Sequence, residues 1–192
     1  MSARKLGNQV RIIGGQWRGR KLEFPDVPGL RPTPDRVRET LFNWLAPVLP
    51  GSRCLDLFAG SGALGFEAAS RGAAEVLLVE RDPRIVKALR EQAQRFDAEA
   101  LQVVQADIQQ YLGGTPQAYD VVLLDPPFGK DLLGPTLHAL AAGWLAPGAR
   151  IYLEAERELR AEALSELLPN GLELVRSKVA GQVGYHLAHR VA

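Results

Sequence analysis

Residues 55–65 read Leu55-Asp56-Leu57-Phe58-Ala59-Gly60-Ser61-Gly62-Ala63-Leu64-Gly65. An apolar strand ends here at an acidic residue, and the chain then turns through three glycines into a helix. Glycines permit tight turns and let a backbone approach a bound molecule where a Cβ atom would collide. The spacing of these glycines also suits a dinucleotide, so the spacing alone leaves the ligand open. The segment predicts a strand, glycine loop and helix that together bind a cofactor.

The acidic residues at the ends of the first three strands indicate which cofactor this is. Asp56 would repel a pyrophosphate but attract the ammonium and sulfonium groups of S-adenosylmethionine. Glu80 ends the next apolar run, 24 residues after Asp56, where a carboxylate can accept hydrogen bonds from ribose hydroxyls. Asp107 follows the third strand and can accept from an adenine amino group, although aspartate is also a common helix cap. Together these positions favour S-adenosylmethionine.

Outward from the glycine loop, short apolar strands alternate with helical segments. This alternation is typical of a mostly parallel sheet with helices on both faces. Two later strands are joined only by Ala180-Gly181-Gln182, and so short a link makes them antiparallel. We therefore predict an α/β protein with the Rossmann-like, seven-stranded sheet of class I methyltransferases. The expected strands are 53–57, 74–79, 101–104, 119–124, 149–154, 172–179 and 183–190, and the expected helices are 62–71, 83–95, 131–143 and 157–168.

The N-terminal segment predicts a separate small element. Two strands, Gln9–Ile13 and Arg20–Phe24, flank a glycine-rich turn and suggest a hairpin. A proline-rich stretch then leads to a helix for which Thr33 is the expected N-cap, with Pro34 at the first helical position. We predict that residues 1–30 form a basic extension that docks RNA and that residues 31–192 form the methyltransferase domain.

Charge is unevenly distributed along the chain. The net charge is +1, yet residues 1–21 hold six Lys or Arg and no acid. Clustered cations suit a polyanion such as RNA, although a solvated basic tail has the same composition. Trp17 in the turn can stack on an RNA base or simply be an exposed turn residue. The expected RNA contacts are Arg11, Arg18, Arg20, Lys21 and, from the following helix, Arg38.

The remaining composition excludes several classes of protein. Hydrophobic residues make up 46% and charged residues 23% of the 192 residues, as in ordinary globular proteins. Cys54 is the one cysteine, which excludes an internal disulfide and suits a reducing cytoplasm. No apolar run approaches the roughly 20 residues of a membrane span. The three histidines lack metal-ligand spacing. We assign the histidines no role and expect a cytoplasmic monomer.

Asp125-Pro126-Pro127-Phe128 ends the fourth strand beside the expected cofactor crevice. An exocyclic amino group on a base is a poor nucleophile because its lone pair is delocalised into the ring. The Asp125 carboxylate and the Pro126 carbonyl can hold its two N–H bonds and turn the lone pair towards a methyl group. The prolines stiffen the loop, and Phe128 offers a face to a flipped-out base. The tetrapeptide predicts methylation of an amino group on a nucleic-acid base.

These residues resemble a known family. Asp-Pro-Pro-Phe after an Asp-x-x-x-Gly-x-Gly strand is similar to class I amino-methyltransferases. The segments Arg11–Leu22 and Arg31–Asn43, with Gly181-Gln182-Val183-x-Tyr185 near the end, resemble the bacterial enzymes that make N2-methylguanine at position 966 of 16S ribosomal RNA. The resemblance runs from about Arg11 to Tyr185. It implies a methyltransferase without a metal, acting on the small ribosomal subunit.

The resemblance also assigns roles to single residues. It places Thr33 and Arg36, with Glu39, over the methionine end of S-adenosylmethionine. It implies that Asp125, Pro126, Pro127 and Phe128 hold the guanine. The full set of expected cofactor contacts is Thr33, Arg36, Asp56, Phe58, Gly60, Gly62, Glu80, Arg81, Asp107, Ile108 and Asp125.

Three other functions remain open from the sequence. An adenine N6 or DNA methyltransferase can use the same tetrapeptide. An NAD-dependent oxidoreductase fits the glycine spacing but has no evident group for hydride transfer. A catalytically silent RNA-binding or assembly factor could keep the fold, but the intact Asp56 and Asp125 argue against that interpretation.

Overall fold

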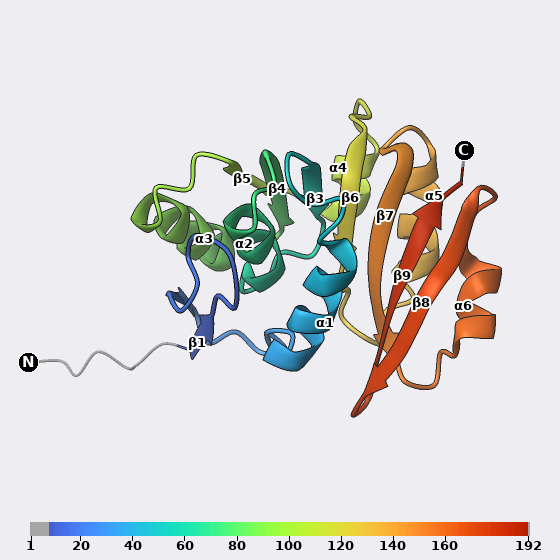
Figure 1. Cartoon of the computed structure of the whole chain (residues 1–192), viewed down its shortest axis with the longest axis horizontal. Helices are drawn as coiled ribbons and strands as arrows, with labels where there is room; N and C mark the ends of the chain where they lie inside the picture. Colours follow the sequence, from blue (N-terminus) through green and yellow to red (C-terminus); the bar gives the residue numbers. More distant parts are fainter. Residues whose placement is uncertain (1–7, 192) are drawn as a thin grey trace, which may run out of the picture.

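In the computed structural model, which describes residues 8–191, the strands form two separate sheets (Figure 1). The large sheet has seven strands in the order β5-β4-β3-β6-β7-β9-β8, and β9 is the strand that runs antiparallel to both of its neighbours. This arrangement confirms the predicted fold class. Its strands are β3 (Arg53–Asp56), β4 (Glu75–Glu80), β5 (Leu101–Gln105), β6 (Tyr119–Leu124), β7 (Leu145–Glu156), β8 (Leu172–Ala180) and β9 (Val183–Arg190).

The order of the strands determines where a ligand can bind. From β3 the chain builds outward through β4 and β5, and it then returns to place β6 on the other side of β3. In such sheets ligands bind outside the carboxyl ends of the strands where the order reverses. Asp56 ends β3 and pairs in parallel with Leu123 of β6, two residues before Asp125. The fold therefore brings Asp56 and Asp125 to the same edge of the sheet.

Helices cover both faces of the sheet, and each face has its own apolar cluster. Burying each large apolar side chain contributes roughly 1.5–3 kcal/mol to folding. The short helix α4 (Ile108–Leu112), which is absent from the helices predicted from the sequence, begins directly after Asp107. One face carries α1 (Asp35–Leu45), α2 (Ala63–Ser70) and α3 (Pro83–Arg95), and the other carries α4 (Ile108–Leu112), α5 (Leu133–Ala141) and α6 (Ala161–Leu167).

The N-terminal hairpin forms the second sheet from β1 (Asn8–Arg11) and β2 (Lys21–Phe24), and it lies beside α2 and α3 (Figure 1). Trp17 in its turn is only 7% exposed and meets Phe96 edge-on, with ring centroids 5.3 Å apart. Both alternatives predicted for Trp17 were therefore wrong, because the indole is buried and is neither exposed in the turn nor free to stack on an RNA base. The hairpin shares the core cluster of α1–α3.

Backbone contacts fix this hairpin against α2. The amide of Gln16 donates to the carbonyl of Ser70 over 2.8 Å. Gly15 has φ +75°, and a Cβ atom there would lie 1.9 Å from the same carbonyl oxygen. The close approach therefore requires a glycine at this position.

Arg38 joins the hairpin, α1 and α2 through its guanidinium. The residue is 0% exposed and donates to the carbonyls of Thr33 (3.0 Å) and Arg11 (2.9 Å) and to the carboxylate of Asp35 (2.5 Å). Its other partner is the buried Glu67, at 3.5 Å. The structure does not support the expected contact between Arg38 and RNA, because no atom of this side chain reaches the surface. A buried cation that is fully bonded in this way has a structural role.

Among residues 8–191, no helix is long and apolar enough to cross a membrane.

Candidate active site

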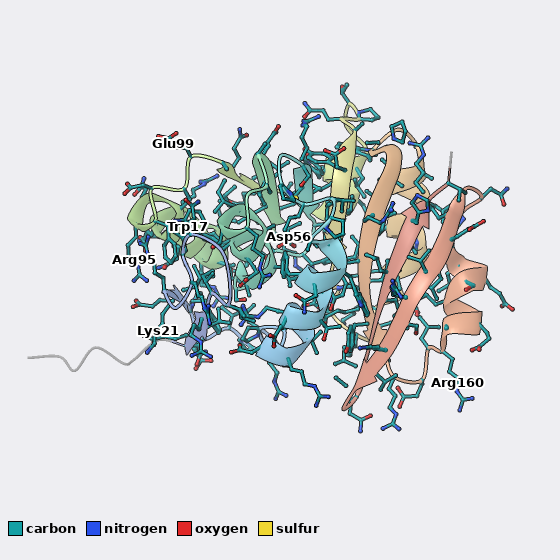
Figure 2. All side chains as sticks on the ribbon, viewed as in Figure 1. Trp17, Lys21, Asp56, Arg95, Glu99 and Arg160 are labelled. Carbon is teal, nitrogen blue, oxygen red and sulfur yellow. The ribbon has the colours of Figure 1, made fainter. Side chains whose placement is uncertain are left out.

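Asp56 lies in the interior of the molecule at the end of β3 (Figure 2). Its side chain is almost fully buried, and Oδ2 accepts a hydrogen bond from the amide of Gly65 over 3.1 Å. Oδ1 is also buried and has no hydrogen-bond partner among the described residues. Burial raises the pKa of Asp56 to about 7, and the charges of Glu80 and Glu154 act in the same direction. A buried, unpartnered carboxylate oxygen fits a cationic ligand group.

The glycine loop follows Asp56, and its glycines have separate physical reasons. Gly60 and Gly62 have φ +50° and +80°, a left-handed conformation that other residues rarely adopt. A Cβ atom at Gly62 would lie 2.6 Å from Leu89, and one at Gly65 would lie 2.1 Å from Leu78. Turn geometry therefore explains Gly62, and packing between helix and sheet explains Gly65. Neither glycine requires the close approach of a ligand that the sequence suggested.

Glu80 and Asp107 occupy the next strand ends along the same edge. Glu80 accepts hydrogen bonds from the amides of Gly60 (3.1 Å), Arg81 (2.8 Å) and Asp82 (2.9 Å), which fix its carboxylate beside the glycine loop. Asp107 is exposed and caps α4 by accepting from the amides of Gln109 and Gln110. Both carboxylates therefore have structural partners, and Glu80 is half-buried whereas Asp107 is exposed.

The other expected cofactor contacts differ in exposure. Phe58 and Ile108 are half-buried against the apolar cluster of α4–α6, whereas Arg36 and Arg81 are exposed. Among the predicted cofactor contacts, the four acids at strand ends lie along one edge of the sheet. These acids are Asp56, Glu80, Asp107 and Asp125.

Asp125 lies beside a cluster of buried polar groups that was not predicted from the sequence. The Thr33 hydroxyl donates to Glu154 over 2.8 Å and lies 3.4 Å from Oδ2 of Asp125. The Tyr152 hydroxyl also donates to Glu154 over 2.8 Å. Burial raises the pKa of Asp125 well above its usual value, and the charges of Glu154 and Asp56 raise it further. Burial raises the pKa of Glu154 as well, so both carboxyl groups hold their protons more tightly than exposed carboxyl groups do.

This cluster corrects the expected role of Thr33 in the helix. The N-cap of α1 is Pro34, and no side-chain hydrogen bond caps the helix. The Thr33 hydroxyl is directed to Glu154 and Asp125 because an uncompensated buried carboxylate is costlier than an uncapped amide at an exposed helix end. Glu154 was missed because it lies within an apolar strand. The visible signal was an acid two residues after Tyr152, on the same face of β7.

The rest of the tetrapeptide differs in exposure along its length. Pro126 is buried, whereas Pro127 and Phe128 are exposed. Phe128 is 42% exposed, an unusual position for a large apolar side chain, and its ring is free to stack on a planar ligand. The amide of Gly129 donates to the carboxylate of Glu156 over 2.6 Å, which ties the end of this loop to β7.

The residues present fit S-adenosylmethionine. Asp56 has a buried carboxylate oxygen without a partner among residues 8–191, and the ammonium or sulfonium group of the cofactor would offset the cost of burying that charge. Within residues 8–191, no group of three His, Cys, Asp or Glu residues could hold a metal ion.

The hairpin cations fall into two groups. Arg11 forms an ion pair with Asp35 at 3.3 Å, and the guanidinium of Arg20 lies 3.8 Å from the ring centroid of Phe96. Arg18 and Lys21 are exposed and belong to none of the ion pairs found in the described part of the chain. Arg95 of α3 donates to the backbone carbonyl of Lys21 and forms an ion pair with Glu23 of β2 at 3.3 Å (Figure 2).

Comparison with known proteins identifies the family. A family model described as "Conserved hypothetical protein 95" matches residues 10–189. The chain is 50% identical to ribosomal RNA small subunit methyltransferase D of Escherichia coli strain K12. The 185 aligned residues cover 96% of this chain and 91% of that protein. The protein of the same name from Haemophilus influenzae is 43% identical and covers 93% of each chain.

Solved structures agree with this result. The structure of yhhF from Escherichia coli, described as a candidate methyltransferase, superimposes with a TM-score of 0.85 at 48% identity and covers 96% of this chain and 99% of that one. Magnesium protoporphyrin IX methyltransferase from Synechocystis PCC 6803 with bound S-adenosylmethionine shares the fold, with a TM-score of 0.66 at 21% identity over 81% of this chain and 78% of that one. With this fold, and over nearly its whole length, the chain belongs to the family of ribosomal RNA small subunit methyltransferase D.

Proposed function

We propose that this protein transfers a methyl group from S-adenosylmethionine to the exocyclic N2 of a guanine in 16S rRNA of the small ribosomal subunit, at position 966. The observation that carries the proposal is the placement of Asp125-Pro126-Pro127-Phe128 beside the buried Glu154 and on the same sheet edge as Asp56. The names of the relatives support small-subunit rRNA as the substrate. The sequence resemblance supports guanine N2 and the position.

The residues of this chain act mainly by orienting the two substrates. Asp56, the glycine loop and Glu80 hold S-adenosylmethionine, with Asp107 and Ile108 against the adenine and Thr33 at the methionine end. The Asp125 carboxylate and the Pro126 carbonyl accept the two N–H bonds of the guanine amine while Phe128 stacks on the base. Fixing an amine in line with the methyl group converts an encounter in solution into an oriented step. Bound S-adenosylmethionine supplies the electrophilic methyl group.

A proton must leave the nitrogen as the transfer proceeds. The N–C bond forms, the C–S bond breaks with its electron pair passing to sulfur, and the nitrogen gives one proton to a base. Asp125 is the nearest carboxylate in this arrangement, and it shares the Thr33 hydroxyl with Glu154. We assign Glu154 a positioning role, because its charge adds to the effect of burial in raising the pKa of Asp125.

Replacing Glu154 by glutamine is expected to shift the pH dependence of methyl transfer. Asp125 must be ionised to accept the amine, so the rate rises as the pH rises through the pKa of Asp125. Burial and the charge of Glu154 both raise that pKa, so removal of the Glu154 charge should move the rising limb to lower pH. The glutamine amide keeps an oxygen for the Thr33 and Tyr152 hydroxyls. Single-turnover rates between pH 5.5 and 9 measure the shift; the exposed Glu158→Gln is the control, and an unmoved limb would refute the positioning role.

We propose that the hairpin side of the molecule docks the RNA. This proposal follows the predicted division into a basic extension over 1–30 and a methyltransferase domain over 31–192, in a monomer that works in the cytoplasm. The exposed Arg18 and Lys21 carry it, with Arg11 and Arg20 as partly engaged neighbours.

Arg18→Glu should weaken binding to small ribosomal subunits by about tenfold or more at moderate salt, because phosphate contacts dominate such affinity. The dissociation constant of S-adenosylmethionine should stay unchanged. Arg160→Glu is the matched control, since Arg160 is exposed at the start of α6, at the opposite end of the molecule from Lys21 (Figure 2). Equal loss of affinity in both variants would remove the hairpin from the docking surface.

The proposed reaction is tested by methyl transfer from labelled S-adenosylmethionine to small ribosomal subunits that lack the modification. Nucleoside analysis of the product separates N2-methylguanine from N6-methyladenine, the product of the nearest alternative chemistry. Label on guanine N2 is the expected result, and label on adenine would replace the proposal by that alternative.

A further inference from the structure

A concave pocket of about 530 Å³ lies between α1 and the β8–β9 hairpin. Its walls include Arg36 and Thr40 of α1, Lys178 and Val179 of β8, and Gly181 and Tyr185 of the hairpin. The turn at Gly181 and the residue Tyr185 belong to the C-terminal motif of the family resemblance, to which the methyl-transfer reaction assigns no role. The pocket is therefore a feature that the proposed chemistry leaves unexplained.

The pocket is positively charged. Arg36 and Lys178 come from different walls, and no residue that lines the pocket is acidic. In the part of the chain that the structure describes, neither cation belongs to an ion pair. Two such cations that converge on one hollow create a local site for an anion.

An aromatic pair supports the Lys178 side of the pocket. Trp44 stacks on Tyr185 with ring centroids 5.6 Å apart and planes 25° from parallel. Nζ of Lys178 lies 6.0 Å from the centroid of the Trp44 ring. This contact can hold the ammonium group over the hollow while leaving its hydrogen-bond donors free.

The pocket adjoins the catalytic cluster. Tyr185 of β9 is the direct cross-strand partner of Glu154 of β7, so both side chains lie on the same face of the sheet. Arg36 follows Thr33 by three residues, and the Thr33 hydroxyl bridges Glu154 and Asp125. An anion in the pocket would therefore lie beside a base held by Asp125.

We propose that this pocket binds a phosphodiester group of the RNA strand next to the target base; the proposal rests on the proposed function. A base taken out of its stack needs its backbone held, and phosphate contacts provide that positioning. The volume lies in the range of pockets that take a nucleotide-sized ligand. The methionine carboxylate of S-adenosylmethionine is the other anion that Arg36 could bind. RNA is favoured because the pocket is far larger than a carboxylate and has its second cation on β8.

Lys178→Ala and Arg36→Ala, each compared with Arg160→Ala, test the pocket. We expect each of the two variants to bind small ribosomal subunits about tenfold more weakly and to lower the slope of log affinity against log salt by about one. Lys178→Arg should restore most of the affinity. For Lys178→Ala, the dissociation constant of S-adenosylmethionine and the melting temperature should match those of the wild type.

Three results would overturn the pocket as an RNA site. The first is unchanged affinity and salt slope in both variants. The second is weaker S-adenosylmethionine binding by Arg36→Ala with unchanged RNA binding, which would assign the anion to the methionine carboxylate. The third is the absence of wild-type binding to the subunits, which would remove the proposed function too. Binding that depends on Lys178 together with methylation of another base would refute the function and retain the pocket.

Discussion

Asp125→Asn is expected to lower the rate of methyl transfer at saturating cofactor and RNA by about a thousandfold, within the range for loss of a group that acts on the transferred proton. The amide keeps the shape of the side chain but cannot carry the negative charge that stabilises the developing positive charge on nitrogen. The dissociation constant of S-adenosylmethionine should change by less than about threefold, because the interaction is lost mainly in the transition state. Single-turnover transfer and calorimetric binding measure the two quantities.

The same variant should be more stable than the wild type at pH 8 without ligands. The pKa of Asp125 is raised in the folded state, so the folded protein loses stability as the pH rises above the unfolded pKa of the group. Asparagine removes that loss, so the melting temperature at pH 8 should rise and exclude unfolding as the cause of a slow rate. Asp97→Asn, at an exposed position with φ +50°, is the control. Turnover near that of the wild type would contradict the catalytic role of Asp125.

Asp56→Asn is expected to weaken S-adenosylmethionine binding by about a hundredfold, because it removes the charge that faces a buried cation. The asparagine oxygen can still accept from the amide of Gly65, so the strand end and glycine loop should keep their geometry. Binding to small ribosomal subunits should be unchanged. Calorimetric titration of the cofactor against both proteins gives the comparison.

The pH dependence of binding gives an independent test of Asp56. Its pKa is about 7 in the ligand-free protein, and a bound cation favours the ionised form. Below pH 7 the cofactor must therefore displace a proton, and its affinity should rise about tenfold per pH unit before levelling above pH 7. Asp56→Asn should flatten this profile. A wild-type affinity that does not vary between pH 5.5 and 8.5 would show that Asp56 is already ionised or remote from the ligand.

Much of the fold was predictable because its signals are local in the sequence. The glycine loop after Asp56 and the short link at Gly181 determine a parallel sheet with an antiparallel last hairpin. Helix α4 was missed because five residues are too few to show helical periodicity. Strand β7 begins at Leu145, earlier than predicted, because Pro147-Gly148 within it has the composition of a turn.

The site was predictable where residues stand at strand ends. The carboxyl ends of parallel strands meet at one edge, so Asp56, Glu80, Asp107 and Asp125 could be grouped from their positions alone. Residues whose partners are distant in the chain could not be interpreted in this way.

The predictions for Arg38 and Trp17 show the reason. Arg38 has the composition of a surface cation, yet its partner Glu67 is brought beneath it by the packing of α1 on α2. Trp17 lies in a basic turn, but it fills the space beside Phe66 and Phe96. Glu154 likewise gains its meaning only from the strand pairing that sets it beside Asp125. In each case burial by a remote element decides the role.

The proposed reaction is tested most directly by methyl transfer from labelled S-adenosylmethionine to small ribosomal subunits isolated from a strain that lacks this protein, with Asp125→Asn as the inactive control. We expect the wild-type protein to place the label on N2-methylguanine at one 16S rRNA position and the control to place almost none. Label on another base, or no incorporation by a protein that still binds the cofactor, would refute the proposed reaction.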